Sequence, residues 1–199
     1  MTLARDALIT AIDFEGTGAV SGWRDEPWQV GLITLRQGRV VPESAFESLL
    51  RIGDRPFNRH APGRHAQWRD QMRTAPDLPA LWPGLGPRLE GSVLAAHNPA
   101  TERRYLSHAF PLHPPGITLD TLALARLAYP KLTAYRLGDL LERLCLTPRV
   151  QQLVPGRAPH DALYDATGCA VLLEHILALP GWDTASVETL VQAQAPRGR

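Results

Sequence analysis

Two acidic residues near the start of the chain have the type and spacing needed to hold a metal ion. Asp13 and Glu15 follow an apolar run at residues 7–12 that predicts a buried strand. Because side chains alternate along a strand, the two carboxylates point the same way and repel each other unless a cation lies between them. Mg²⁺ and Mn²⁺ prefer such oxygen ligands. On its own, the stretch fits an acidic, glycine-rich turn equally well.

A third carboxylate, Glu102, lies near the start of a predicted helix. Asn98 is expected to be the N-cap of that helix and Pro99 its first residue. Glu102 would then fall in the first helical turn. An acidic residue there is also favoured simply by the helix dipole, so this position alone does not establish a catalytic role.

The remaining candidates, His160 and Asp165, are separated by about 140° on an ideal helix and cannot share a face. We therefore expect His160 on the loop before a helix, Asp161 near the N-cap, and Asp165 facing the sheet. An apolar run follows Asp165, and a carboxylate buried there needs a partner. The alternative for His160 is a surface histidine on a loop, and the alternative for Asp165 is an ordinary polar residue of the helix.

The elements that would position these residues alternate between strands and helices, which predicts one mixed α/β domain. The sheet begins as an antiparallel meander, since three strands follow one another with short turns. Further strands are predicted at 28–35, 39–51, 92–96 and 117–119. Helices are predicted at 63–74, 78–89 (broken by Pro and Gly), from 98 onward, at 121–129 and 135–146, within 160–179 and at 183–194, with a loop at 149–159.

Composition limits the function classes only loosely. The 199 residues are 44% hydrophobic, enough for a substantial core, and carry 21 basic and 20 acidic residues. A nucleic-acid-binding protein of this net charge must concentrate its cations locally. Residues 55–73 contain five arginines with Trp68 among them, and these side chains form either a solvated face or a substrate contact. Arg103 and Arg104 likewise are either exposed to solvent or in contact with substrate phosphates.

The sequence predicts no secretion signal and no membrane span, so we expect a cytoplasmic protein that does not contact membranes. Both cysteines, Cys145 and Cys169, fall in helical stretches and are expected to be reduced. We divide the chain into a domain at residues 1–180 and a short helix with a polar tail at 181–199.

The three motifs together resemble those of the DnaQ-like, DEDDh-type 3′–5′ exonucleases. Asp13-Phe-Glu15-Gly-Thr-Gly resembles the first motif, Ala96-His97-Asn98-Pro-Ala-Thr-Glu102 the second, and His160-Asp-Ala-Leu-Tyr-Asp165 the third. The resemblance extends over residues 7–178. It implies a ribonuclease H-like fold, a three-layer α/β/α arrangement around a five-stranded mixed sheet.

The resemblance also implies a mechanism and a set of site residues. Two divalent ions, Mg²⁺ or Mn²⁺, would support hydrolysis of the terminal phosphodiester, with His160 as general base. Asp13, Glu15 and Asp165 would hold the first ion, and Asp13 with Glu102 the second. The 3′-terminal nucleotide would contact Gly16, Thr17, Gly18, His97 and Asn98.

Two departures from the usual motifs accompany the resemblance. Gly16 stands where the first motif usually has Thr, and Glu102 stands where the second usually has Asp. The longer Glu102 side chain changes the reach of the ligand expected to support the second ion.

The expected partner is nucleic acid with a free 3′ end, with single-stranded DNA favoured and RNA possible. The alternatives are an RNA exonuclease, a nucleic-acid-binding or scaffold protein that has lost turnover, and a polymerase subunit that acts only with a partner. The residues do not identify a protein partner.

Overall fold

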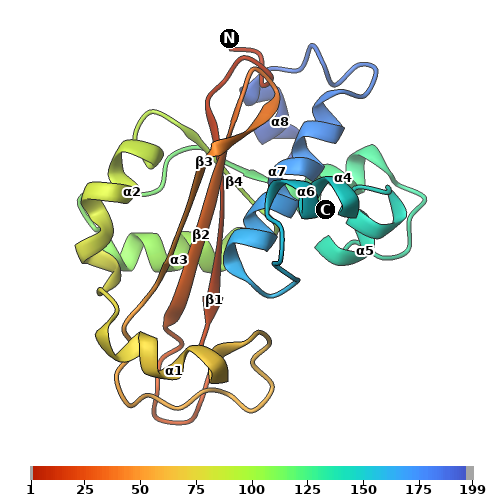
Figure 1. The fold of residues 1–199 in the computed structure, drawn as a ribbon. Coiled ribbons are helices and arrows are strands. Elements are labelled where there is room, and N and C mark those ends of the chain that lie inside the picture. The colour runs from red at the N-terminus through yellow and green to blue at the C-terminus, as the bar shows by residue number, and fades with distance from the viewer. Residues whose placement is uncertain (1, 196–199) are drawn as a thin grey trace.

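The computed structural model describes residues 2–195, so the last residues of the predicted polar tail lie outside the described part. Its centre is a five-stranded mixed sheet in the order β3-β2-β1-β4-β5, with the first three strands antiparallel and β4 and β5 parallel to β1 (Figure 1). This confirms the predicted α/β class and sheet. The strands are β1 Ile9–Gly16, β2 Pro27–Arg36, β3 Arg39–Leu49, β4 Val93–Ala96 and β5 Thr118–Asp120.

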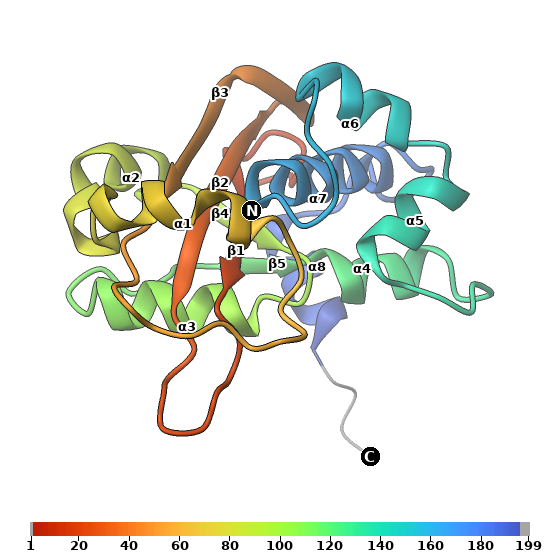
Figure 2. The same cartoon turned by 60° about the horizontal axis from the view of Figure 1, so that its bottom comes forward.

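Helices cover both faces of the sheet, giving three layers, and α1 lies near the end of β1 (Figures 1 and 2). One face carries a 3₁₀-helix at Leu78–Leu81, α2 Trp82–Leu89 and α3 Ala100–Ala109. The remaining helices are α1 His65–Thr74 and, on the other face, α4 Thr121–Ala128, α5 Leu137–Arg143, α6 Thr147–Leu153, α7 Ala162–Leu177 and α8 Val187–Gln194.

The alternation of side chains along β1 determines which layer receives the acidic residues. Ile12 and Phe14 belong to the core shared with α2 and α3, whereas Ile9 and Ala11 belong to the core shared with α7. Continuing the two-residue period places Asp13 and Glu15 on the α7 side. The acidic pair is therefore on the same face as the helix that carries Asp165.

Gly31 on β2 allows α7 to approach the sheet backbone closely. A β-carbon at Gly31 would lie 2.2 Å from the backbone nitrogen of Leu163. No side chain larger than hydrogen fits there without moving the helix. Because Gly31 pairs with Asp13 across the strands, this contact brings the start of α7 beside the acidic end of β1.

Several predicted boundaries are wrong. The first strand begins at Ile9 rather than at residue 7, and it contains Asp13 and Glu15 at its end as predicted. The helix expected from Asn98 begins at Ala100, since Asn98 adopts a φ of +69° that an N-cap residue does not have. The helix expected at 135–146 covers only 137–143. The loop expected at 149–159 contains most of α6, where Pro148 lies in the first turn and Val150 is fully buried.

The C-terminal helix α8 packs on the main core. Val187 and Leu190 are buried there, and the backbone nitrogen of Val187 donates a hydrogen bond to Thr2. The domain boundary placed at residue 180 stays a prediction. Within residues 2–195, no helix has both the length and the apolar character needed to cross a membrane.

Candidate active site

The acidic pair on β1 lies in a strongly negative, poorly solvated environment. Glu15 is 7% exposed, and burial together with the charges of Asp165, Asp161 and Glu102 raises its pKa to about 8. Burial likewise raises the pKa of Asp13 well above its ordinary value, and Asp165 and Glu15 add to this effect. The carboxylates of β1, α3 and α7 are therefore close enough to disfavour one another's ionisation.

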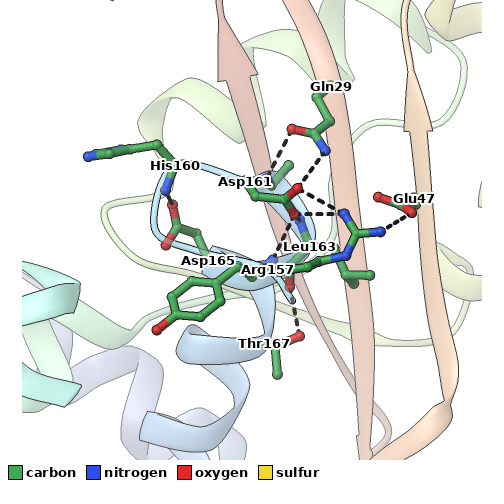
Figure 3. Close-up of polar contacts among 10 residues, drawn as sticks. Gln29, Glu47, Arg157, His160, Asp161, Leu163, Asp165 and Thr167 are labelled. Carbon is green, nitrogen blue, oxygen red and sulfur yellow. Dashed lines mark hydrogen bonds and ion pairs between the residues drawn. The ribbon is translucent and has the colours of Figure 1, made fainter. Parts of the chain in front are cut away.

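Helix α7 begins at Ala162 with Asp161 as its N-cap, in agreement with the expected place of Asp161 near the cap. The Asp161 carboxylate accepts hydrogen bonds from the backbone N–H groups of Leu163 at 3.1 Å and Tyr164 at 3.2 Å. It also accepts from Nε2 of Gln29 on β2 at 3.3 Å, and from Nη1 of Arg157 at 2.8 and 3.0 Å (Figure 3). Asp161 thus attaches the start of α7 to the sheet and to the preceding loop.

Arg157 extends this attachment to the edge strand. Its Nη2 donates to the Glu47 carboxylate on β3, while its Nη1 contacts Asp161 (Figure 3). The sequence analysis did not identify Arg157, because its partner on β3 is more than a hundred residues away. A single arginine on a loop carries no local signal of such a pairing.

His160 lies on the loop before α7, as expected from the helical spacing. Its backbone has a φ of +65°, and its N–H donates to Oδ2 of Asp165 at 2.9 Å. The exposed imidazole points away from Asp161 (Figure 3). Glu15, His160 and Asp165 each place one potential ligand atom within 4.8 Å of the others. Burial raises the pKa of Asp165 to about 6, although the hydrogen bond from His160 opposes this shift.

Glu102 lies in the first turn of α3 and is 7% exposed. Burial raises its pKa to about 7, partly offset by backbone hydrogen bonds and by Arg104. Among the described residues, none donates a hydrogen bond to the buried Oε2 atom of Glu102. A buried carboxylate oxygen without a partner is costly, which makes it a candidate ligand for a cation.

His97 uses both ring nitrogens within the protein. Nε2 lies 2.8 Å from the carbonyl of Tyr135, and Nδ1 lies 3.0 Å from the hydroxyl of Thr121. Burial lowers the pKa of His97, so its neutral ring donates from Nε2 to the carbonyl and accepts at Nδ1. His97 therefore links β4 to α4 and to the segment before α5, and only the ring face remains to contact a ligand.

Gly16 is required by the packing of the loop that follows β1. A β-carbon there would lie 2.4 Å from the Tyr105 hydroxyl and 2.8 Å from Oδ1 of Asp25. This explains why glycine replaces the threonine usual in the first motif: Tyr105 on α3 occupies that space. The adjacent Thr17 is fully buried, and its hydroxyl accepts from the backbone of Glu26.

Asp25 fixes this loop and was missed in the sequence analysis. Its carboxylate accepts from the backbone nitrogen of Gly18 at 2.7 Å, the Tyr105 hydroxyl at 2.6 Å and Nη2 of Arg104 at 2.7 Å. Arg104 is thus paired within the protein. The partners come from separate elements, so the sequence spacing does not reveal them.

Some of these residues line one open groove of about 740 Å³, which we call the catalytic groove. One wall contains Asp13, His160 and Asp165, and Asn98 lies at its edge beside His97. The rest of the lining comes mainly from α4, α5 and the segment between them, and includes Arg126 and Arg136. The structure therefore brings the carboxylates of β1 and α7 together with the loop histidine and the His97–Asn98 corner.

Comparisons with known proteins identify the family. The sequence model of the exonuclease family matches residues 10–173, and the chain belongs to this family. The structure resembles exonuclease X in complex with 5′ overhanging duplex DNA, with a TM-score of 0.70 and 26% identity over 94% of this chain and 99% of that chain. It also resembles the nuclease domain of 3′hExo, a DEDDh family member bound to rAMP, with a TM-score of 0.70 and 17% identity over 89% and 94% of the two chains.

Curated relatives agree with this assignment. A DNA polymerase III subunit epsilon-like protein of Rhodobacter capsulatus is 27% identical over 161 residues, which cover 79% of this chain and 22% of the relative. The 3′-5′ exonuclease DinG of Staphylococcus saprophyticus is 23% identical over 185 residues, which cover 91% of this chain and 19% of the relative. The chain spans about a fifth of the length of these relatives. The predicted DEDDh class and ribonuclease H-like fold are confirmed.

Proposed function

We propose that this chain hydrolyses phosphodiester bonds from the free 3′ end of nucleic acid, releasing nucleotides one at a time with the help of divalent metal ions. The observation that carries this proposal is the grouping of β1 and α7 carboxylates with His160, of which Asp13, Asp165 and His160 line one open groove, with Glu102 of α3 close enough to raise the pKa of Asp13. The family membership supports the same reaction class.

The residues of the site fit metal ions of the Mg²⁺ or Mn²⁺ type. Several carboxylates share a buried region, and a cation between them would remove the repulsion that raises their pKa values. The unpartnered Oε2 of Glu102 would gain a ligand. We assign Asp13, Glu15 and Asp165 to one ion and Asp13 with Glu102 to a second. When bound, two such ions stabilise the charge on the attacking and leaving oxygens.

His160 is proposed as the general base. Its imidazole is exposed to the groove and lies within reach of Glu15 and Asp165, so it can take a proton from an attacking water and pass it to solvent. The hydrogen bond from its own N–H to Asp165 fixes the loop backbone and limits where the ring can lie. Asp165 thus positions the base in addition to its proposed role as ligand.

The 3′-terminal nucleotide is proposed to lie between the Gly16–Gly18 turn and the His97–Asn98 corner. The side chain of Thr17 and the ring nitrogens of His97 already have partners. Binding there would therefore use backbone groups, the His97 ring face and the exposed Asn98 amide.

We favour DNA as substrate because exonuclease X, a relative with this fold, is described in complex with DNA. Free thiols at Cys145 and Cys169 within the described residues agree with the proposed cytoplasmic location.

The test uses DNA and RNA oligonucleotides labelled at the 5′ end, incubated with Mg²⁺, Mn²⁺ or EDTA. A ladder of products that shortens stepwise from the 3′ end, with nucleoside monophosphates released and no reaction in EDTA, is the expected result. Internal cleavage, or the same rate in EDTA, would refute the proposed reaction. The ratio of the rates on the DNA and RNA oligonucleotides tests the DNA preference.

A further inference from the structure

The arginine-rich stretch at residues 55–73 does not act as one surface. Nη1 of Arg55 donates to the carbonyl of Arg24 at 2.9 Å, and the same guanidinium lies 3.7 Å from Glu26. Nη2 of Arg69 donates to the carbonyl of Arg55 at 2.8 Å, and its guanidinium lies over the Phe57 ring at 5.3 Å. These two arginines hold loops together, so they are not available to a substrate in this arrangement.

Arg64 and Trp68 behave differently. Arg64 precedes the first residue of α1 and Trp68 follows one turn later, so the two side chains lie on the same face. Trp68 is 38% exposed, and Arg64 is exposed. Within residues 2–195, no carboxylate forms an ion pair with Arg64. One face of α1 therefore offers an aromatic surface and an unpaired cation.

This face lines a second groove of about 490 Å³, which we call the α1 groove. Its other walls are the end of β3 and the loop at residues 155–161. Pro159 and His160 line both the α1 groove and the catalytic groove. The proposed general base thus stands at the junction of the two grooves, and a strand that passes His160 enters both.

The two carboxylates of the α1 groove are bound to an arginine, which balances one of their two negative charges and so reduces their repulsion of an anionic ligand. Glu47 and Asp161 both pair with Arg157. Arg64 then remains as the available cation in the groove. An aromatic side chain beside a cation is the combination that binds single-stranded nucleic acid without sequence preference, through base stacking and phosphate pairing.

We propose that the α1 groove binds the nucleotides on the 5′ side of the scissile phosphate, with one base stacked on Trp68 and one phosphate paired with Arg64. This inference rests on the proposed function, in which the catalytic groove holds the 3′-terminal nucleotide. An exonuclease that removes single nucleotides keeps one nucleotide beyond the scissile bond, so the rest of the strand must leave on the other side of His160. The α1 groove begins there.

The first experiment compares two substrates, a single-stranded oligonucleotide and the p-nitrophenyl ester of thymidine 5′-monophosphate, which has no upstream nucleotide. Trp68→Ala and Arg64→Ala should lower the ratio of kcat/KM for the oligonucleotide to that for the ester by at least about fivefold, as expected for a lost stacked base or phosphate contact. Trp68→Phe should restore most of the ratio. Arg73→Ala, an exposed change in the last turn of α1 outside the groove, is the control and should leave the ratio unchanged.

An unchanged ratio in both Trp68→Ala and Arg64→Ala, or an equal loss on both substrates, would overturn the inference. A wild-type protein that hydrolyses neither substrate would refute the proposed function instead. In that case the groove is tested by fluorescence anisotropy with a labelled oligonucleotide in Ca²⁺. Arg64→Ala should weaken binding and reduce the slope of log K against log [salt] by about 0.7, the value for one single-strand phosphate contact. Equal affinities and slopes for wild type, Arg64→Ala and Trp68→Ala would refute the binding site.

Discussion

The backbone N–H of His160 donates a hydrogen bond to Oδ2 of Asp165, a residue in the first turn of α7. The two residues cannot share a helix face, yet the left-handed backbone of His160 turns the loop back toward Asp165. A proposed metal ligand therefore also orients the segment that carries the proposed base. This contact gives the five-residue spacing between His160 and Asp165 a direct structural reason.

Replacing His160 with Ala should reduce turnover by about 10²- to 10⁴-fold, the usual contribution of a general base. Because the imidazole is exposed, added imidazole should restore part of the rate, and the melting temperature should change little. Steady-state kinetics with and without imidazole provide the measurement. Full activity in the variant would show that another group accepts the proton.

Shortening Glu102 to Asp should raise the Mn²⁺ concentration needed for half-maximal activity. The change withdraws the carboxylate by one methylene from a site where its Oε2 has no protein partner among the described residues. Glu102→Gln, which keeps the length and removes the charge, should lower activity at all metal concentrations. Higher activity in Glu102→Asp than in wild type would instead show that the glutamate is a compromised ligand.

Without metal, the protein should lose stability as the pH rises from about 5 to about 8. Glu15, Glu102 and Asp165 have pKa values raised to about 8, 7 and 6 from ordinary values of 4.5, 4.5 and 3.8. The folded state therefore binds more protons than the unfolded state in this window, and the stabilising contribution present at low pH is lost as these groups ionise. Thermal unfolding in EDTA measures the effect.

Mn²⁺ or Mg²⁺ should reverse this loss, because a bound cation stabilises the ionised carboxylates. The increase in melting temperature on adding metal should be larger at pH 8 than at pH 6. Asp13→Ala should reduce the increase at pH 8. A metal-induced shift that is the same in wild type and in Asp13→Ala would show that the ions bind elsewhere.

Replacing Gly16 with Ala should destabilise the fold by about 1–3 kcal/mol, the usual cost of overpacking. The added methyl group would lie 2.4 Å from the Tyr105 hydroxyl. Tyr105→Phe removes that oxygen, so Gly16→Ala should cost less in the Tyr105→Phe background, by at least about 0.5 kcal/mol. Urea unfolding of the four proteins in this double-mutant cycle gives the coupling energy. Strict additivity would contradict the proposed steric contact.

The sequence predicted the sheet and the position of the acidic residues because both depend on local patterns. The alternation of apolar residues defines β1, and the same period places Asp13 and Glu15 on one face. Asp161 was recognisable as an N-cap because its type and its place before an apolar helix are sufficient. The roles assigned to the site residues stay predictions until they are measured.

The contacts that hold the site together could not be predicted in this way. Arg157 pairs with Glu47, which lies 110 residues earlier in the sequence. Tyr105 pairs with Asp25, which lies 80 residues earlier. Such contacts depend on how the elements pack, not on local spacing. The helix α6 was missed for a similar reason, because the burial of Val150 against the core supports a segment with weak helical periodicity of its own.

We expect the carboxylates gathered at the end of β1 to support metal-dependent hydrolysis from the 3′ end. The most direct measurement is the rate of nucleotide release from single-stranded DNA by wild type, Asp13→Ala and Asp70→Ala across a Mn²⁺ titration. Asp70 is an exposed carboxylate on α1, outside both grooves, so its variant controls for the loss of one negative charge. We predict metal-dependent release by wild type and Asp70→Ala and none by Asp13→Ala. Equal release by Asp13→Ala would contradict the assignment of the active site.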